Sequence, residues 1–265
     1  METIVGRIIN GDAPDPPLSS ARELCARGFV VWLNNNCGFE IERLMPRYVS
    51  AAMSTVYLFG DEAGNFDFSD GPGASRYFVL ATVTMSNCQA GDRLQALRRR
   101  LAWQGIHLGA VLHATGDPQS VRDEVFRTLA LCEMRIDATI ISKRSIPATM
   151  RNPQDLYRYV WHEHFARIAQ DIAQPGDRLL AVASDLGTRK RRGAFHVAVD
   201  EAVRASARCT HRVAFWPNMS EPCLVVADYC TWAIQRKWER NDARSQVLLA
   251  DKISSETEIE VTGNK

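Results

Sequence analysis

The sequence predicts an α/β fold with a mixed sheet, at least partly parallel, flanked by helices. Short apolar segments alternate with amphipathic helical segments along residues 53–255, which is the pattern of strands joined by crossover helices. The chain is 46% hydrophobic and 24% charged, as in an ordinary globular protein. It contains no run of about 18 apolar residues, so no spanning helix and no membrane partner are expected.

The expected strands are the apolar runs at residues 55–60, 77–85, 109–113, 136–141, 179–184 and 211–215. Helical spacing of leucine and valine predicts helices between them, the last two at 192–207 and 224–240. Two helices are expected to begin at Asp117-Pro118 and Asn152-Pro153. In each pair the first residue is a capping residue, and proline suits the first helical position.

Residues 1–52 differ from the rest of the chain, because GDAPDPPLSS interrupts both helix and strand periodicity. We expect an N-terminal extension (1–52), one domain (53–255) and a C-terminal tail (256–265). Two interpretations of the extension stay open. It is either a disordered over-long reading of the gene upstream of a true start at Met53, or an appendage packed on the domain.

Charge and cysteine content restrict the partners and the compartment. The 32 basic and 31 acidic residues give a net charge of +1, so a polyanion has to be held by a local patch rather than by bulk charge. The seven cysteines include no close Cys-x-x-Cys pair, and the N-terminus lacks a secretory signal. Reduced thiols and a cytoplasmic location are therefore expected.

Three aspartates stand out by their positions. Asp61 directly follows the apolar run TVYLFG, and Asp185 directly follows LLAVAS. Side chains at the carboxyl ends of strands converge in open α/β sheets. Asp228 lies in the apolar sequence LVVAD, where a carboxylate is costly to bury unless it is paired or bound to a metal. For each of the three, a structural role as a turn, cap or first-turn helix residue stays open.

Three carboxylates from distant parts of the chain are what a Mg²⁺ or Mn²⁺ site requires, because hard cations prefer oxygen ligands beside substrate phosphates. Two such ions would activate a water and stabilise the leaving oxygen of a phosphodiester. Glu62 adjoins Asp61, and His113 and Lys143 end or follow expected strands, so they are further candidates for this site. A basic run follows Asp185 and is expected to contact nucleic-acid phosphates, with a solvated loop as the alternative: Arg189, Lys190, Arg191 and Arg192.

Several segments resemble the bacterial and phage domain-of-unknown-function family 3800. They are YLFGDEAGNFDF with RYFVLATV, then AVLHA, DATIISK, VASDLGTRKR and CLVVADYCTWAIQRKWE, in the family's order from Met53 to about Ile253. The family is regarded as ribonuclease-H-like. The resemblance therefore implies a ribonuclease-H-like fold and a metal-dependent nuclease or a relative of one.

Carried over by position, Asp61 and Glu62 match the family's N-terminal acidic pair, and Asp228 matches the aspartate of its closing helix. The strand-end positions of the family are matched by Asp185, His113 and Lys143. The sequence departs from the family pattern at two places. Ala63 replaces the usual serine, and Val225 stands where the family often has glutamine.

The leading hypothesis is a nuclease that binds Mg²⁺ or Mn²⁺ through Asp61 and Asp228, with Asp185 completing the site and Glu62 as ligand or base. One alternative is a catalytically inactive nucleic-acid- or protein-binding module on the same fold, which Val225 favours. Another is a hydrolase of a nucleotide or other small phosphate ester. The sequence does not predict the choice of DNA or RNA, the number of metals or the oligomeric state.

Overall fold

A computed structural model describes residues 29–33, 39–43, 53–185 and 189–261. The chain divides into two compact units, Met1–Ala52 and Met53–Lys265. In the first, strands β1 (Phe29–Leu33) and β2 (Phe39–Arg43) form an antiparallel pair. The other residues of the predicted extension lie outside the described residues. The second unit contains the candidate site.

The second unit is built on a six-stranded sheet with the order β7-β6-β3-β4-β5-β8. Strand β4 runs antiparallel to β3 and β5, whereas β6 is parallel to β3, β7 to β6 and β8 to β5. All strands except β4 therefore end at one side of the sheet, which we call the carboxyl edge. The strands are β3 (Thr55–Ala63), β4 (Tyr77–Met85), β5 (Arg135–Ser142), β6 (Arg178–Ser184), β7 (Thr210–Trp216) and β8 (Ile253–Ile259).

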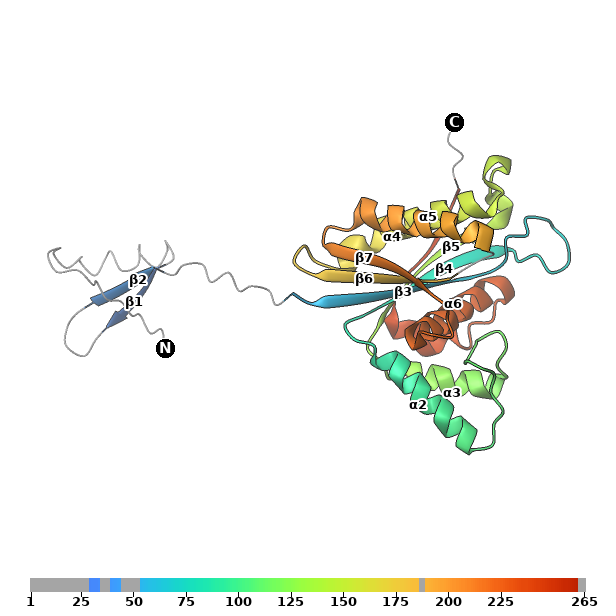
Figure 1. Ribbon diagram of the computed structural model, residues 1–265, viewed down its shortest axis with the longest axis horizontal. Coiled ribbons are helices and arrows are strands. Elements are labelled where there is room, and N and C mark those ends of the chain that lie inside the picture. The colour runs from blue at the N-terminus through green and yellow to red at the C-terminus, as the bar shows by residue number, and fades with distance from the viewer. Residues whose placement is uncertain (1–28, 34–38, 44–52, 186–188, 262–265) are drawn as a thin grey trace. The chain divides into compact units, whose positions relative to one another are not determined.

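Helices cover both faces of this sheet (Figure 1). Helix α6 packs on β3 and β4, with α2 against α6 and α3 against α2, while α4 and α5 pair on the opposite face. The helices are α2 (Gln89–Trp103), α3 (Gln119–Ala130), α4 (Pro153–Ile172), α5 (Arg189–Ser206) and α6 (Pro222–Arg240). The predicted α/β class, with a mixed sheet flanked by helices, is confirmed.

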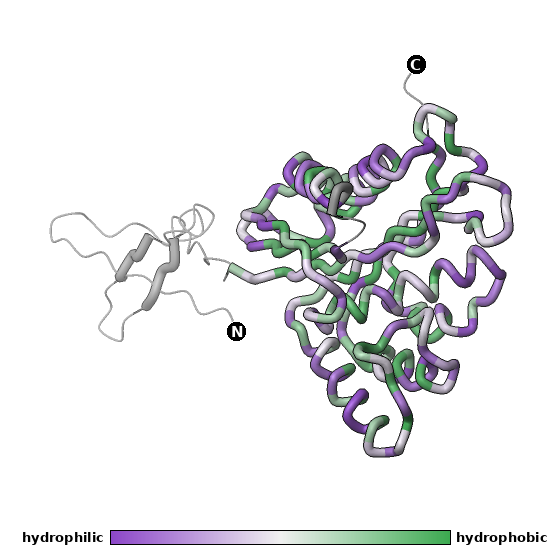
Figure 2. Tube along the Cα trace, turned by 45° about the vertical axis from the view of Figure 1, so that its right-hand side comes forward, coloured by the Kyte–Doolittle hydropathy of each residue, from purple (hydrophilic) through white to green (hydrophobic). Residues whose placement is uncertain are grey.

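Alternation along the strands divides the apolar residues between two cores. Neighbouring side chains of a strand point to opposite faces, so Phe59 packs with the α6 layer and Leu58 with the α4 layer. Both residues are buried, as are Leu80 and Ala81 on β4. Green segments along the central strands in Figure 2 mark this apolar interior. Full burial of a Leu or Phe side chain contributes about 1.5–3 kcal/mol.

The strand expected at 109–113 is wrong, because this apolar segment is a loop. Its backbone donors are taken by side chains instead of a neighbouring strand. His113 N donates to Asp117 Oδ2 (2.8 Å) and Ala114 N donates to Asp228 Oδ2 (2.8 Å). Leu112 is buried all the same. An apolar run thus indicated burial correctly and secondary structure incorrectly.

The predicted C-terminal boundary also differs, because strand β8 continues to Ile259. Its polar residues are satisfied by tertiary contacts that spacing does not show. Glu256 accepts from Lys237 Nζ at 2.7 Å and also from the indole of Trp238, and Ser255 Oγ donates to Asp137 Oδ1 at 2.6 Å.

The two proline-marked helix starts have different outcomes. Asn152 caps α4, because its side chain accepts from Asp155 N at 2.9 Å. Asp117 does not cap α3, where Pro118 occupies the N-cap position. The carboxylate of Asp117 accepts from His113 N and from the hydroxyl of Tyr229 instead. Among the described helices, none is both long and apolar enough to cross a membrane.

His164 is a core residue of α4, only 1% exposed. Its Nε2 lies 2.8 Å from Thr82 Oγ1 on β4, and its Nδ1 lies 2.8 Å from Thr139 Oγ1 on β5. Burial lowers the pKa of His164 to about 3, because the surrounding core disfavours the charged ring. The imidazole is therefore a neutral hydrogen-bonding bridge between the sheet and α4.

Candidate active site

A cleft of about 500 Å³ opens at the carboxyl edge of the sheet. Side chains reach it from the end of β3, from the loop that follows β3, from the segment before α3, from the end of β6 and from α6. Of the candidates predicted from sequence, Asp61, Glu62, His113 and Asp228 line this cleft. The parallel direction of β3 and β6 brings Asp61 and Ser184 to the same edge, and the packing of α6 on β3 brings Asp228 there.

Asp61 is a buried carboxylate of the cleft, with 6% of the residue exposed. Burial raises the pKa of Asp61 well above its ordinary value, and the charges of Glu62 and Asp228 raise it further. A hydrogen bond from the Ser184 side chain lowers it in part. Within residues 53–185 and 189–261, no lysine, arginine or histidine forms an ion pair with Asp61. The Asp61 carboxyl group therefore has two acidic neighbours and no direct basic partner among these residues.

Asp228 projects from α6 into the same cleft. The helix begins at Pro222, so Asp228 lies in its second turn and the first-turn interpretation is wrong. Its Oδ2 accepts from Ala114 N (2.8 Å) and lies 3.1 Å from His113 Nδ1. Across the described part of the chain, Oδ1 makes no hydrogen bond. Thr231 Oγ1, one turn further on, donates to the carbonyl oxygen of Asp61 (3.3 Å) and ties α6 to β3.

His113 is the solvent-facing partner of Asp228, since its side chain is 54% exposed. The hydrogen bond to Asp228 raises the pKa of His113, although partial burial opposes the shift. The cleft therefore holds a histidine that is more readily protonated than usual, beside a carboxylate that it orients.

Glu62 follows Asp61 on β3, so its side chain points to the opposite face of the strand. There Trp161 Nε1 lies 3.4 Å from Glu62 Oε1, while Oε2 is buried with no hydrogen-bond partner among the described residues. Burial raises the pKa of Glu62 to about 7, and interactions with Tyr157 and Trp161 offset part of the effect. A carboxyl group that titrates near neutral pH can act as a general base.

Asp185 does not line the cleft. Strand alternation gives the cleft position to Ser184, and Asp185 turns toward α5 instead. Its Oδ1 lies 2.9 Å from Arg192 Nε and 3.5 Å from His196 Nε2. The charge of Arg192 thus faces a carboxylate of its own chain. The side chains of Arg189, Lys190 and Arg191 lie outside the described residues, and so does any contact they make.

The described residues contain no group of three or more His, Cys, Asp or Glu side chains placed to hold a metal ion. The pair formed by Asp61 and Asp228 is what the cleft offers as oxygen ligands. Mg²⁺ is commonly bound by one or two carboxylates together with water and substrate phosphates, and this pair fits that requirement.

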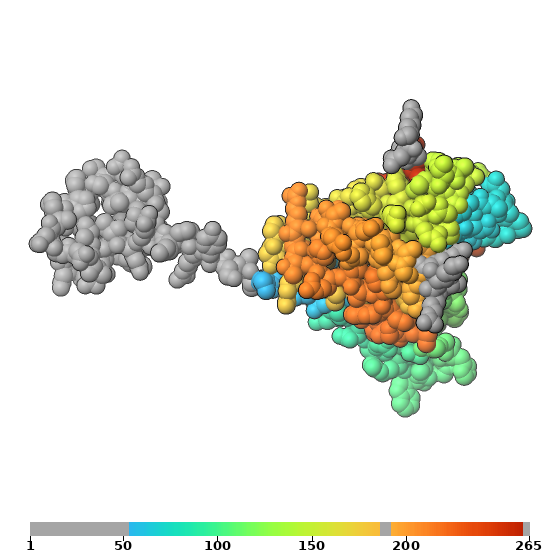
Figure 3. All heavy atoms as spheres, turned by 45° about the horizontal axis from the view of Figure 1, so that its top comes forward, coloured from blue at the N-terminus to red at the C-terminus, as the bar shows by residue number. Residues whose placement is uncertain are grey.

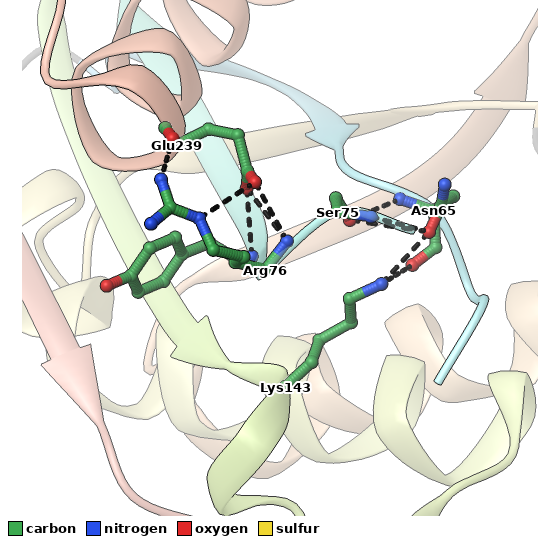
Figure 4. Close-up of polar contacts among 6 residues, drawn as sticks. Asn65, Ser75, Arg76, Lys143 and Glu239 are labelled. Atoms are coloured by element: carbon green, nitrogen blue, oxygen red, sulfur yellow. Dashed lines mark hydrogen bonds and ion pairs between the residues drawn. The ribbon is translucent and has the colours of Figure 1, made fainter. Parts of the chain in front are cut away.

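Lys143 contacts a loop rather than the cleft. Its Nζ donates to Asn65 O (3.1 Å), Asn65 Oδ1 (2.9 Å) and the carbonyl oxygen of Asp67, as Figure 4 shows for Asn65. Burial lowers the pKa of Lys143. The lysine predicted to meet a phosphate or a water therefore anchors residues 64–76, the loop between β3 and β4.

The other end of this loop is held by Glu239 from the end of α6. Its carboxylate accepts from the backbone nitrogens of Arg76 (3.0 Å) and Tyr77 (3.1 Å), and it pairs with Arg76 Nε at 3.2 Å (Figure 4). Within the loop, Asn65 N donates to Ser75 Oγ at 3.0 Å. Asn65 and Ser75 both line the cleft. Lys143 and Glu239 thus fix one wall of the site.

Gly64 marks the start of the loop, and only glycine fits there. Its φ of +96° is in the left-handed region, and a Cβ would lie 2.4 Å from the carbonyl oxygen of Tyr77. We expect Gly64→Ala to lower the free energy of unfolding by at least about 2 kcal/mol, since strain and backbone overlap add. Urea denaturation measures this. Gly73→Ala is the matched control, because Gly73 has the same φ but open space around its Cβ position. Equal losses in the two variants would contradict the steric explanation.

A row of cleft residues on α6 was not predicted from the sequence. Trp232, Arg236 and Arg240 follow Asp228 at intervals of four residues, and all of them line the cleft. Residues four apart share one face of a helix, so this spacing could have predicted that these side chains lie on the same side of α6 as Asp228. Val225, by contrast, is buried in the core and does not line the cleft. The amide that the family often carries at that position would not point into this cleft.

Comparison with known proteins adds no assignment. No protein-family model matches the chain, and none of the curated proteins is significantly similar to it. The resemblance to domain-of-unknown-function family 3800 stays a prediction.

Proposed function

We propose that this chain is a metal-dependent phosphodiester hydrolase of the ribonuclease-H-like kind, with Mg²⁺ or Mn²⁺ held by Asp61 and Asp228. One observation carries the proposal. Two carboxylates from β3 and α6 share a cleft in which burial, and then the negative charges of Glu62 and Asp228, raise the pKa of Asp61. A bound divalent cation would remove that repulsion and turn an unfavourable arrangement into a binding site.

The roles of the protein groups follow from their surroundings. When bound, the ion supplies charge stabilisation for the phosphoryl oxygens and acidifies a water. Glu62 lines the cleft, but its carboxyl group lies on the α4 face of β3, so with a pKa of about 7 it accepts the proton of the attacking water through an intervening water. His113, oriented by Asp228, donates a hydrogen bond or a proton toward the leaving oxygen. Ser184 holds the side chain of Asp61 in place, and Thr231 in the middle of α6 holds its backbone carbonyl.

The experiment is a cleavage assay of purified protein with single-stranded, duplex and hybrid substrates, in Mn²⁺ and in EDTA. We expect cleavage in Mn²⁺ and none in EDTA. The rate should rise as the pH increases through about 7, because Glu62 must lose its proton to act as a base. Glu62→Gln should lack that pH-dependent limb.

Thermal unfolding gives an independent test of the metal site. A ligand that binds only the native state stabilises it, by about 2.7 kcal/mol at a hundred times its Kd. We therefore expect the melting temperature to rise with Mn²⁺. No shift at millimolar metal, together with no cleavage, would overturn the proposal. Nucleic-acid binding without cleavage or shift would instead support the inactive binding module.

A further inference from the structure

A second hollow lies beside the carboxylate cleft, between the β3–β4 loop and the segment that leads into α4. It has a volume of about 450 Å³. In Figure 3, the cyan atoms of the loop lie against the yellow-green atoms of that segment. Ser75 lines both this hollow and the carboxylate cleft. A single extended ligand that passes over Ser75 can therefore occupy both the hollow and the cleft.

This basic hollow, defined by Arg76, Lys143, Arg144 and Arg151, contains one acidic lining residue, Asp70. The cations differ in availability. Arg76 is paired with Glu239, and the ammonium of the buried Lys143 is taken by loop oxygens. Arg144 and Arg151 are exposed and form no ion pair within the described ranges of the second unit. Arg151 donates its Nε to Ile146 O at 3.0 Å, which leaves its terminal nitrogens for a ligand.

We infer that the basic hollow binds a backbone phosphate of a polynucleotide whose adjoining phosphodiester occupies the carboxylate cleft. The inference rests on the proposed function and specifies its substrate class: an oligonucleotide chain rather than a mononucleotide or another small ester. Guanidinium groups match phosphate geometry and keep their charge at all relevant pH values. The buried Lys143 adds a fixed positive charge and holds the loop that forms the wall between the two sites.

An acidic peptide is the competing occupant. A carboxylate-bearing peptide could satisfy Arg144 and Arg151, but it offers nothing for the negatively charged Asp61 and Asp228. A nucleic-acid strand satisfies both, because one phosphate meets the arginines and the next meets a cation held by the carboxylates. The shared residue Ser75 favours such a continuous ligand.

The binding test uses the full-length protein in EDTA, so that no cleavage occurs, with fluorescent single-stranded oligonucleotides of increasing length. We expect the Arg144→Gln, Arg151→Gln double variant to raise the Kd for a long oligonucleotide about tenfold. The slope of log Kd against log salt should fall by about 0.7 for each phosphate that the variant no longer binds. Arg144→Gln alone should show part of the effect, and it removes no hydrogen bond from the described fold.

Arg208→Gln is the matched control. Arg208 is also exposed, but it precedes β7 and so lies at the opposite edge of the sheet. Its Kd and salt slope should equal those of the wild type. An unchanged Kd in the double variant, or an acidic peptide that competes as strongly as an oligonucleotide of equal charge, would overturn the inference.

A cleavage assay of the same variants tests this inference separately from the proposed function. In Mn²⁺ the double variant should have a higher KM for oligonucleotides and an unchanged rate on bis(p-nitrophenyl) phosphate, which is too small to reach the basic hollow. Equal effects on both substrates would overturn the inference while cleavage itself stands. If the wild type cleaves neither substrate, the proposed function fails, and arginine-dependent oligonucleotide binding in EDTA would still support the phosphate site.

Discussion

Replacement of Asp61 by asparagine is expected to reduce Mn²⁺-dependent phosphodiester cleavage at least about a hundredfold and, at the same time, to stabilise the metal-free protein. Activity is lost because the amide of asparagine lacks the negatively charged oxygen that is proposed to bind the metal ion. The gain in stability has the same origin, because burial and two neighbouring acids raise the pKa of Asp61 and make its ionised form costly. A neutral amide is free of that cost, and about 0.5–2 kcal/mol is typical of such changes at strained functional sites.

Urea denaturation in EDTA and in Mn²⁺ measures both parts. In EDTA, Asp61→Asn should be more stable than the wild type, and in Mn²⁺ the wild type should gain stability while the variant does not. Asp228→Asn should likewise lose cleavage, because it removes the second proposed ligand. If the double variant, Asp61→Asn with Asp228→Asn, cleaves at the same rate as the wild type, the carboxylate mechanism is wrong.

Asp185→Asn is the matched control for these variants. Its carboxylate faces Arg192 and His196 rather than the cleft, so its loss should lower stability, by about 1 kcal/mol or less for such a partly exposed pair. It should leave the Mn²⁺-dependent stabilisation unchanged. Loss of that stabilisation would place Asp185 among the metal ligands after all, as its position in the sequence predicts.

The second large effect is expected at His164, whose folded pKa of about 3 lies far below the ordinary value of 6.5. The folded ring stays neutral while the unfolded ring gains a proton below pH 6.5. The stability contributed by the neutral ring is therefore present above pH 6.5 and lost as the pH falls toward 3. The loss amounts to about 1.4 kcal/mol per pH unit, or roughly 5 kcal/mol in all.

Glu62 acts in the opposite direction. Its folded pKa of about 7 exceeds the ordinary value of 4.5, so its contribution is full below pH 4.5 and is lost as the pH rises through 7. The two effects oppose one another between pH 4.5 and 6.5. Because the two contributions partly cancel, the pH dependence of the wild-type stability does not separate them. The measurement therefore has to compare variants.

We expect His164→Gln to be less stable than the wild type at pH 7, because Thr82 and Thr139 lose their ring partner. That deficit should shrink by about 1.4 kcal/mol for each pH unit between 6 and 4. Urea denaturation at four pH values measures it. His162→Gln, on the exposed face of the same helix, should show no such change. A deficit that is constant with pH would mean that the buried ring titrates normally.

The fold was predicted from sequence wherever local pattern and burial agree. The strand segments at 55–60, 77–85 and 136–141 and the helix capped by Asn152 are of this kind. The errors arise where polar groups are satisfied by tertiary contacts that spacing in the sequence does not show. Backbone nitrogens of the loop around His113 donate hydrogen bonds to two aspartates, and Glu256 of β8 accepts a hydrogen bond from α6.

The candidate site was predictable in part for a similar reason. Asp61 and Asp228 meet because a strand end and a helix face converge. His113 joins them from a loop, although the sequence indicated a strand end at this position. Asp185 and Lys143 share the carboxyl edge, but strand alternation and a buried loop contact turn them elsewhere. Sequence position locates the edge of the sheet on which a residue lies. It does not give the direction of the side chain.

Helix α6 has a further consequence through its angular register. Asp228, Trp232, Arg236 and Arg240 all face the cleft because each lies about one turn after the last. One residue inserted after Asp228 would rotate everything downstream by about 100°, and it would carry Glu239 away from the loop that it holds. Intolerance to any change in length is therefore the evolutionary signature to seek in this helix.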